Sequence, residues 1–426
     1  MNRSAYKIHI IGAGVSGLIA AKTLEEAGYN PIIIEASSGV GGRVKTDIVE
    51  GYQLDHGFQV LLDAYPQAKN HLDFKALNLQ NLKSGAVIFS DGKSQTIGDP
   101  LRDTSLLFPT LLASVASISD KLKIFKLNTA LKKKSIDSIF NSESTSTLDY
   151  LKSRGFSDKV IEQFFKPFFT GIFLEPNLKT SSRMFEFVYK MFGEGSAVLP
   201  KDGICAIPNQ LKAQLSKTEF RFNTKVKQVN DANIALEDGS VLDTHFTIIA
   251  TTADQLIPNL NNQKQDWKSC YNLYFEVDKR SLSDPIIGLI ADKAALINNI
   301  FYHNSVATTA KGSKELLSVT VVKTHQLNES DLVAQVEKEL QTYCHIQTDK
   351  FLKCYHIKQA LPELASLQNT ISPTETQLKS TVFLAGDHLL NGSLNAAMLS
   401  GERAAQGLIM SLEDGLVIDH ISSEYV

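Results

Sequence analysis

Short apolar runs alternate with a longer helix-like stretch at the start of the chain. Lys7–Ile11 is a β-branched apolar run, which predicts a buried parallel strand. Leu18–Ala27 follows as a predicted helix, and Gly28 is expected to cap its C-terminal end. A second apolar run, Pro31–Ile34, predicts another strand and ends on Glu35. The order strand, helix, strand is typical of a βαβ unit with parallel strands.

The turn between the first strand and the helix is rich in glycine, with the spacing G-x-G-x-x-G. Gly12 permits a tight turn, Gly14 lets the backbone approach a pyrophosphate, and Gly17 lets helix and strand pack closely. Glu35 follows by about 20 residues, where a carboxylate can accept hydrogen bonds from a ribose 2′-OH. Because strand, glycines, helix, strand and acid come in order, we predict dinucleotide binding rather than a glycine turn without a ligand. The turn residues assigned to this site are Gly12, Ala13, Gly14, Val15, Ser16 and Gly17.

A second glycine-rich segment directly after Glu35 narrows the choice of dinucleotide. Gly41 and Gly42 let the backbone run close beside a cofactor, and Arg43 supplies a fixed cation near phosphate. The blocks G-A-G-V-S-G-L-x-A-A-x-x-L, I-I-E-A and G-G-R together resemble the flavin-dependent amine oxidase superfamily. That superfamily also holds phytoene and other carotenoid desaturases, carotenoid isomerases and protoporphyrinogen oxidases. The resemblance implies FAD as the cofactor, with Ala36 and Val44 among its contacts.

The resemblance also implies an α/β fold, α+β overall, with a Rossmann-type FAD-binding domain that is discontinuous in sequence. We assign residues 1–75, 196–255 and 355–412 to it, residues 76–195 and 256–354 to an inserted substrate domain of mixed sheet and helices, and 413–426 to a tail. The central return segment predicts a helix, a strand at 221–229, a hairpin at 234–242 and a strand at 246–252. By resemblance, Val226 contacts the adenine through its backbone and Thr251 lies near the first glycine turn.

Two further blocks match the parts of the resembled superfamily that contact the flavin. Asp55, Gly57 and Phe58 form a segment that passes beside the isoalloxazine ring there; a strand and turn without cofactor contact is the alternative. Residues 381–387 predict a strand that ends on Gly386 and Asp387. By resemblance, these two residues bind the ribityl or pyrophosphate part of FAD. A helix follows, and its first N–H groups can stabilise reduced, anionic flavin. The residues assigned in this block are Gly386, Asp387, Ser393, Leu394 and Asn395.

The candidate acid–base residues are two histidines beside these blocks, His56 and His388, although a lone histidine is more often structural. Amine oxidases of the superfamily place aromatic residues in the loop that corresponds to Leu389–Ser393, and this chain has none there. The sequence therefore favours hydride transfer from an apolar substrate to flavin N5, as in carotenoid desaturase-like or protoporphyrinogen oxidase-like enzymes. Amine oxidation, carotenoid isomerisation without net oxidation, and a flavin-holding binding protein are the alternatives.

Phenylalanines crowd residues 164–173, which resemble the P-F-x-x-G-x-[FY] segment in the substrate domains of those enzymes. The rings could line an apolar cavity or pack as ordinary core. Residues 104–134 combine apolar positions at helical spacing with lysines. One interpretation is an amphipathic surface that dips into a membrane and collects a lipid-soluble substrate. A helical pair that covers a cavity, with the lysines solvated, is favoured because the basic residues are few and interspersed.

Composition excludes several other functions. The formal net charge of −3, without a basic bias, argues against nucleic-acid binding. The four cysteines are scattered, so we expect neither disulfides nor a metal site, and none lies in the C-terminal block where covalently flavinylated members carry one. We therefore expect non-covalent FAD. No run of about 18 apolar residues could span a membrane, and the first strand leaves no room for a signal peptide. The expectation is a cytoplasmic enzyme of open oligomeric state, with peripheral membrane contact as an alternative.

Overall fold

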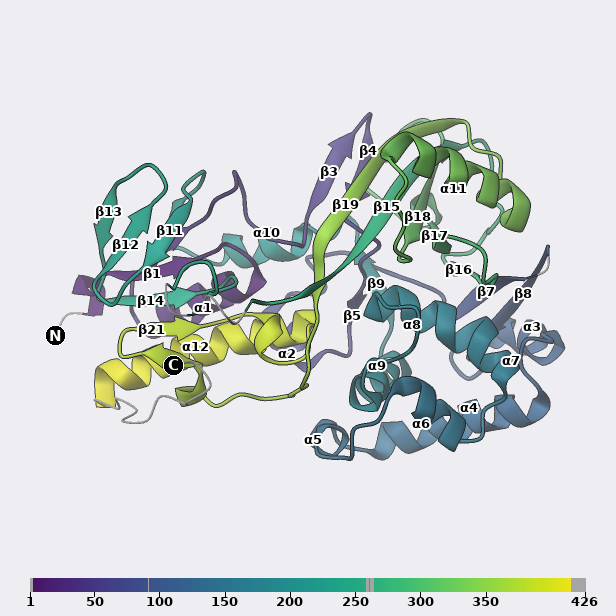
Figure 1. Cartoon of the computed structure of the whole chain (residues 1–426), viewed down its shortest axis with the longest axis horizontal. Coiled ribbons are helices and arrows are strands. Elements are labelled where there is room, and N and C mark those ends of the chain that lie inside the picture. Colours follow the sequence, from purple (N-terminus) through teal and green to yellow (C-terminus); the bar gives the residue numbers. More distant parts are fainter. Residues whose placement is uncertain (1–2, 91, 258–259, 261–263, 415–426) are drawn as a thin grey trace.

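The computed structural model describes residues 3–90, 92–257, 260 and 264–414. Figure 1 shows an elongated molecule with two lobes: β1, α1 and α12 lie in one, and α3 to α9 with the larger sheet lie in the other. Long strands β15 (Trp267–Val277) and β19 (Lys350–Pro362) run from the junction of the lobes into the second one (Figure 1). Most of the predicted tail, residues 415–426, lies outside the described residues.

A six-stranded sheet forms the core of the first lobe. Its order is β10-β2-β1-β14-β21-β20, and every neighbouring pair is parallel except β20 with β21. The strands come from three distant parts of the chain: β1 (Ile8–Ile11), β2 (Ile32–Ile34), β10 (Glu219–Arg221), β14 (Phe246–Ile249), β20 (Gln377–Lys379) and β21 (Val382–Leu384). The predicted parallel βαβ unit is confirmed.

Helices α1 (Val15–Glu26) and α12 (Leu394–Asp414) pack on this sheet and on each other. A Cβ atom at Gly401 of α12 would lie 2.2 Å from the backbone oxygen of Ser16, so only glycine allows the helices to come this close. Gly28 has a φ of +89° and its N–H donates to the oxygen of Glu25, which confirms the predicted cap.

One predicted strand of the return segment is wrong. Residues 221–229 form two strands in different sheets: β10 ends at Arg221, and β11 (Val226–Val229) starts an antiparallel sheet with β12 (Asn233–Leu236) and β13 (Val241–Asp243). The chain changes direction at Asn223, whose φ of +53° is incompatible with a continuous strand. The predicted hairpin is confirmed as β12 and β13. Helix α10 (Ala206–Ala213) precedes them.

A seven-stranded sheet, in the order β19-β15-β18-β17-β16-β7-β8, forms the core of the second lobe. Its remaining strands are β7 (Gly85–Ser90), β8 (Lys93–Gly98), β16 (Ile287–Ile290), β17 (Ile297–Tyr302) and β18 (Glu315–Val321). Helix α11 (Glu329–Cys344) packs on it. The domain boundary that we expect at residue 355 lies inside β19. This edge strand carries three lysines and one histidine, all exposed, and such a polar pattern hides its strand character in the sequence.

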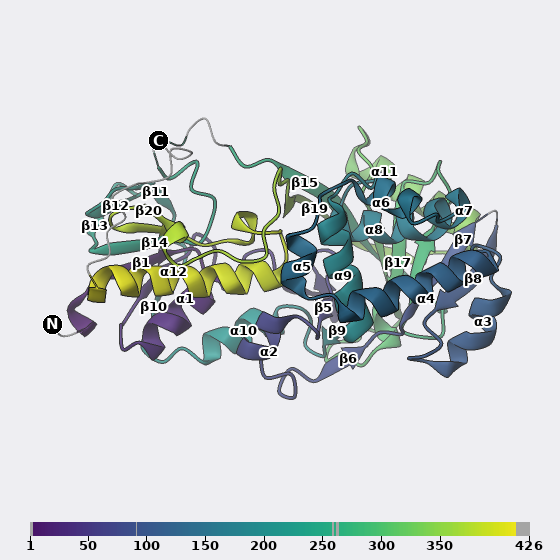
Figure 2. The ribbon, with the colours of Figure 1, turned by 90° about the horizontal axis from the view of Figure 1, so that it is seen from below.

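Helices cover the other side of the second lobe (Figure 2). They are α3 (Leu107–Leu112), α4 (Ile118–Lys133), α5 (Ile136–Phe140), α6 (Thr147–Ser153), α7 (Asp158–Val160), α8 (Lys166–Phe173) and α9 (Ser182–Glu194). The connecting elements are β3 (Thr46–Val49), β4 (Tyr52–Asp55), β5 (Leu61–Leu62), α2 (Pro66–His71), β6 (Leu79–Asn81) and β9 (Ala197–Pro200). None of the described helices is long and apolar enough to cross a membrane.

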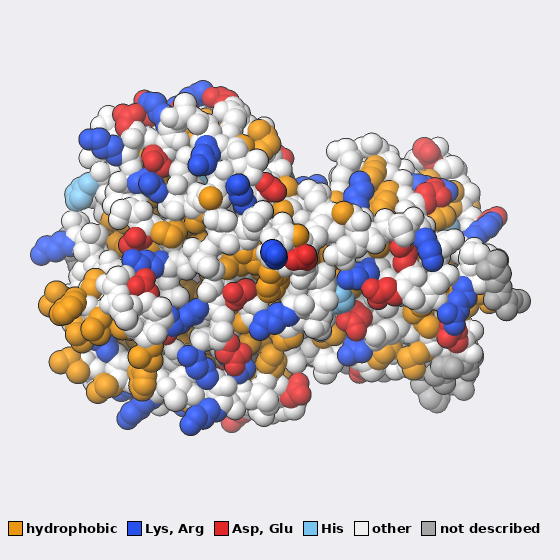
Figure 3. Space-filling model, turned by 180° about the vertical axis from the view of Figure 1, so that it is seen from behind, with side chains coloured by type: hydrophobic (Ala, Val, Ile, Leu, Met, Phe, Trp, Pro, Cys, Tyr) orange, Lys and Arg blue, Asp and Glu red, His pale blue; other side chains and the backbone are white. Residues whose placement is uncertain are grey.

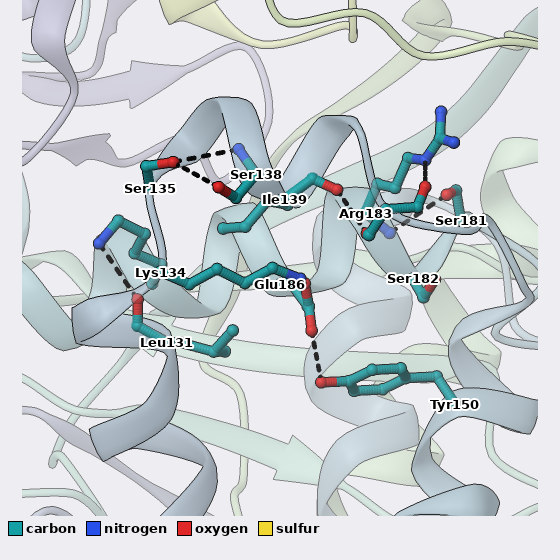
Figure 4. A network of polar contacts seen from close by, with 12 residues as sticks. Leu131, Lys134, Ser135, Ser138, Ile139, Tyr150, Ser181, Ser182, Arg183 and Glu186 are labelled. Carbon is teal, nitrogen blue, oxygen red and sulfur yellow. Dashed lines mark hydrogen bonds and ion pairs between the residues drawn. The ribbon is translucent and has the colours of Figure 1, made fainter.

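A buried carboxylate ties several of these helices together. Glu186 of α9 is only 3% exposed, and its two oxygens accept hydrogen bonds from Tyr150 of α6 at 2.6 Å and from Lys134 at 2.5 Å (Figure 4). Burial and this contact with Glu186 raise the pKa of the Tyr150 hydroxyl. The ammonium and the phenol therefore satisfy a charge that the surrounding apolar side chains cannot.

We expect Glu186→Ala to lower the free energy of unfolding by about 1–3 kcal/mol, because Tyr150 and Lys134 lose their shared acceptor. Urea unfolding followed by circular dichroism measures the change. Glu237→Ala is the matched control, since Glu237 and Lys225 form an exposed ion pair, worth about 0–1 kcal/mol. Equal losses in the two variants would contradict the assignment of Glu186 as a buried structural anchor.

Candidate functional site

A cavity of about 1760 Å³ connects the two lobes. This is well above the roughly 300–1,000 Å³ of a site for one drug-sized ligand. Its wall includes the glycine turn after β1 and the segment after β21 at one end, and α4, α8 and α9 at the other. The cavity has room for a large cofactor and a second molecule beside it.

The cofactor end begins at the first glycine turn, where Gly12, Gly14, Val15 and Ser16 line the cavity. Helix α1 starts there with Gly14 as its N-cap, and no side chain caps its first turn. Its first N–H groups are thus available to an anion. Gly12 has a φ of +106°, as the predicted tight turn requires.

The second glycine segment lies directly against the first. Gly14 and Gly41 form a parallel bridge, and the Gly41 N–H donates to the oxygen of Ala13 at 2.9 Å. A Cβ atom at Gly42 would lie 3.3 Å from the Cα atom of Gly14. Gly41, Gly42, Arg43 and Val44 all line the cavity. Two glycine-containing segments therefore lie backbone against backbone and form one wall of the cavity.

Glu35 lies at the end of β2 and faces the same space. Its carboxylate accepts three hydrogen bonds: from the Ala13 N–H at 2.7 Å, from the Ser37 N–H at 2.8 Å and from the Ser37 hydroxyl at 2.7 Å. Since a carboxylate can accept about four hydrogen bonds, these contacts fix its orientation and leave room for about one more, from a ribose hydroxyl.

The C-terminal block joins this wall through an ion pair. Asp387 is 4% exposed, and its carboxylate pairs with the guanidinium of Arg43. That guanidinium also lies over the ring of Trp267, 5.1 Å from its centre, and donates to the oxygen of Ala360. This part of the wall also includes Gly386, His388, Ser393 and Leu394. Thr251, which follows β14, lines the cavity as well.

Both candidate histidines line the cavity. Burial lowers the pKa of His388, with a smaller contribution from Arg43 and an opposing one from Asp387, so the neutral ring dominates near pH 7. The Nε2 atom of His56 lies 2.9 Å from the carboxylate of Asp47. The His56 ring also packs against Tyr355 at 4.3 Å between ring centres, which fixes its orientation.

The far end of the cavity is lined mainly by apolar side chains, with Lys121, Asn128 and Arg183 as polar residues among them. Phe164 and Phe168 are half-buried and line it, together with Leu122 and Phe125 of α4. Phe165 and Phe169 are fully buried and do not line it. Both interpretations of the phenylalanine segment therefore hold, each for different rings: Phe164 and Phe168 line the cavity, and Phe165 and Phe169 pack in the core.

Six of the residues assigned to the cofactor from the sequence lie outside the lining of the cavity: Ala13, Gly17, Ala36, Asp55, Val226 and Asn395. Asp55 is buried, which raises the pKa of its carboxyl group to about 6, although hydrogen bonds from Thr46 and the Ile204 N–H oppose this. It holds the strand end from which His56, Gly57 and Phe58 reach the cavity. Asn395 accepts a hydrogen bond from the Gln67 N–H, 3.0 Å away.

Sequence reasoning missed the contribution of β15 and β19 to the wall. Trp267, Lys268 and Cys270 of β15 line the cavity, and so do Gln359 to Pro362 of β19. Burial lowers the pKa of Lys268. The one sequence feature that could have drawn attention to this wall is Trp267, the only tryptophan of the chain. The local sequence pattern does not show that β15 and β19 pair and bring their residues to the blocks assigned to the flavin.

Comparison with known proteins agrees with this geometry. A family model for flavin containing amine oxidoreductases matches residues 15–409. The chain is 23% identical to 15-cis-phytoene desaturase of Capsicum annuum, over 96% of this chain and 78% of that one, and 24% identical to hydroxysqualene dehydroxylase of Zymomonas mobilis, over 93% and 97%. A solved oxidoreductase from Methanosarcina mazei shares the fold, with a TM-score of 0.71 at 19% identity over 94% of this chain and 100% of that one.

The predicted superfamily and the predicted α/β fold are thereby confirmed. The family match begins within the first glycine turn, at Val15, and runs through the return segment into the C-terminal block as far as residue 409. The chain belongs to the flavin containing amine oxidoreductase family and is a flavin oxidoreductase.

Proposed function

We propose that the chain binds FAD non-covalently and oxidises an apolar substrate, as in the carotenoid desaturase-like and protoporphyrinogen oxidase-like branch. The observation that carries this proposal is the continuity of the cavity from the glycine turns to the apolar rings of Phe164 and Phe168. A substrate at the apolar end reaches the cofactor end without leaving the protein, and an apolar wall suits a molecule with few polar groups.

The choice of FAD rests on which residues line the cofactor end together. The start of α1 offers N–H groups to a pyrophosphate, and Glu35 follows β2 at the strand end suited to an adenosine ribose. Asp387, Ser393 and Leu394, the residues assigned to the flavin half, line the same cavity. A mononucleotide would leave Glu35 without a ligand.

The state of the thiols supports non-covalent binding. Cys270 is the one cysteine among the cavity-lining residues, and burial raises the pKa of its thiol to about 12. A thiol with so high a pKa is protonated at physiological pH and is a poor nucleophile. No cysteine lies in the segment 381–414 that forms the C-terminal block.

When bound, FAD supplies an acceptor for a hydride from a substrate carbon. The protein then has to position the substrate, exclude water and accept a proton from the neighbouring carbon, so that a double bond forms and the charges balance. We assign proton acceptance to His388, because its neutral ring lies in the wall next to Asp387. His56 is held by Asp47 and has an orienting role.

An amine substrate fits this wall less well. The loop Leu389–Ser393 carries no aromatic ring, and Leu390 within it is 1% exposed and turned into the core. Carotenoid isomerisation uses the same apolar cavity and differs from oxidation in leaving the flavin reduced. The shape of the cavity therefore does not distinguish oxidation from isomerisation; only the redox state of the flavin after turnover does.

The first expected outcome concerns the cofactor. Acid precipitation of the purified protein should release FAD into the supernatant, identified by its absorption spectrum and chromatography. Glu35→Ala should weaken FAD binding about 10- to 100-fold, since a charge-assisted hydrogen bond is worth about 1.5–3 kcal/mol. Glu26→Ala, which removes an exposed acid at the end of α1, is the control. Equal occupancy in both variants would refute the ribose assignment.

The second expected outcome concerns the substrate class. Under anaerobic conditions, a hydrogenated polyene or a porphyrinogen should bleach the flavin absorption, and primary or secondary amines should leave it unchanged. Phe168→Ser should raise the substrate concentration needed for bleaching by about tenfold, because a buried ring contributes about 1.5–3 kcal/mol. Bleaching by amines alone would overturn the apolar assignment, and turnover that needs pre-reduced flavin would indicate an isomerase.

The third expected outcome is a pH dependence. The rate of flavin reduction should rise with pH through a value below the usual histidine pKa of about 6.5, as His388 loses its proton and becomes able to accept one. His388→Gln should remove this inflection and slow reduction by about 10²-fold, and His56→Gln should keep the inflection. An inflection that survives in His388→Gln and disappears in Lys268→Met would assign the proton to Lys268 instead.

A further inference from the structure

Exposed apolar side chains are concentrated on one small part of the surface. Of the eleven large apolar side chains that are exposed among the described residues, eight lie between Leu101 and Phe125; we call these eight the apolar patch. Leu112 is 82% exposed and Phe108 is 72% exposed. Figure 3 shows hydrophobic side chains gathered over the end of the molecule that carries α3 and the start of α4. An exposed apolar patch of this kind usually marks an interaction site.

The patch is also the mouth of the cavity. Six of its side chains are exposed at the surface and at the same time line the cavity: Leu101, Leu107, Leu111, Ile118, Leu122 and Phe125. The opening therefore lies within the patch itself. A molecule that enters there passes from one apolar surrounding to another without crossing water, provided that the patch itself is covered by an apolar phase.

The charge around the patch is mostly positive. Residues 101–134 contain six lysines and one arginine against two acids, whereas the chain as a whole has a net charge of −3. Of the two acids, Asp120 is 1% exposed and accepts hydrogen bonds from Ser117 and Ser157, and Asp103 pairs with Lys83. Lys126, Lys132 and Lys133 of α4 are exposed. In Figure 3, basic side chains lie along the edge of the apolar group.

We propose that the apolar patch docks on an anionic lipid bilayer, with the lysines of α4 on the head groups and the mouth of the cavity at the acyl region. Apolar side chains that insert next to basic ones are the pattern of proteins that lie on such a surface. No described helix could cross the bilayer, so the contact is peripheral. Delivery of an apolar substrate through this surface rests on the proposed function. The docking on a bilayer does not.

Charge decides between a bilayer and a second copy of the chain. In a symmetric dimer through this surface, the lysines of both copies would be brought into one interface, because the same patch meets itself. Like charges brought together in this way repel, whereas an anionic head-group layer neutralises them. The cavity mouth would also be closed by a second copy.

Vesicle flotation of the FAD-loaded protein tests the docking without using turnover. The protein should float with vesicles of phosphatidylcholine and phosphatidylglycerol, and much less with phosphatidylcholine alone. The double variant Phe108→Asp/Leu112→Asp should lower the bound fraction at least about tenfold, because two charges would have to enter the acyl region. Ile48→Asp/Val241→Asp makes the same kind of change at exposed apolar sites outside the patch, in β3 and β13, and should float as the parent does.

Flavin absorbance and the unfolding temperature of each variant show that it is folded, as expected for such exposed positions. Equal flotation of the two double variants would overturn the proposal, and so would a parent protein that binds neither vesicle. A parent that sediments as a dimer, and that Phe108→Asp/Leu112→Asp converts to a monomer without any loss of vesicle binding, would make the patch a self-interface. If the protein floats with anionic vesicles but no apolar substrate bleaches its flavin, the docking stands and only the proposed substrate class is refuted.

Discussion

The site depends on backbone approaching backbone without side chains between. A Cβ atom at Gly17 would lie 2.0 Å from the oxygen of Gly12, and one at Gly401 would lie 2.2 Å from the oxygen of Ser16. These two contacts set α1 against β1 and α12 against α1. Without them the first N–H groups of α1 could not lie at the same wall as the C-terminal block, and an anion would meet side chains in place of N–H groups.

The ion pair between Arg43 and Asp387 joins the parts that the glycines bring near. It connects a segment that follows the first strand pair with one that comes 344 positions later, and Trp267 from the second lobe packs on the same guanidinium. A buried carboxylate needs such a partner, since burying it alone is costly. The polar end of the cavity is thus also the point where the lobes are held to each other, and this gives the cavity a fixed shape there.

Local chemistry was readable from the sequence, and long-range pairing was not. The βαβ unit, the cap at Gly28 and the hairpin at β12 and β13 each depend on residues close together in the chain. The break at Asn223 was missed because its left-handed backbone is dictated by two sheets that the segment has to join. β19 was missed because an edge strand carries polar side chains, and with it the part of the wall that β15 and β19 provide.

The segment 104–134 is a second case in which the sequence pattern predicts the elements but not what their side chains contact. Its periodicity predicted helices correctly, and α3 and α4 do line the cavity, as the favoured interpretation required. Periodicity cannot tell which apolar side chains face a core, because it gives only their angle around the helix. Here several of them face both the cavity and the surface, so the two interpretations were never exclusive. The cavity is therefore polar at the glycine turns and opens among apolar side chains at its other end. The route that we propose for an apolar substrate runs along this polarity, from the apolar opening to the cofactor end.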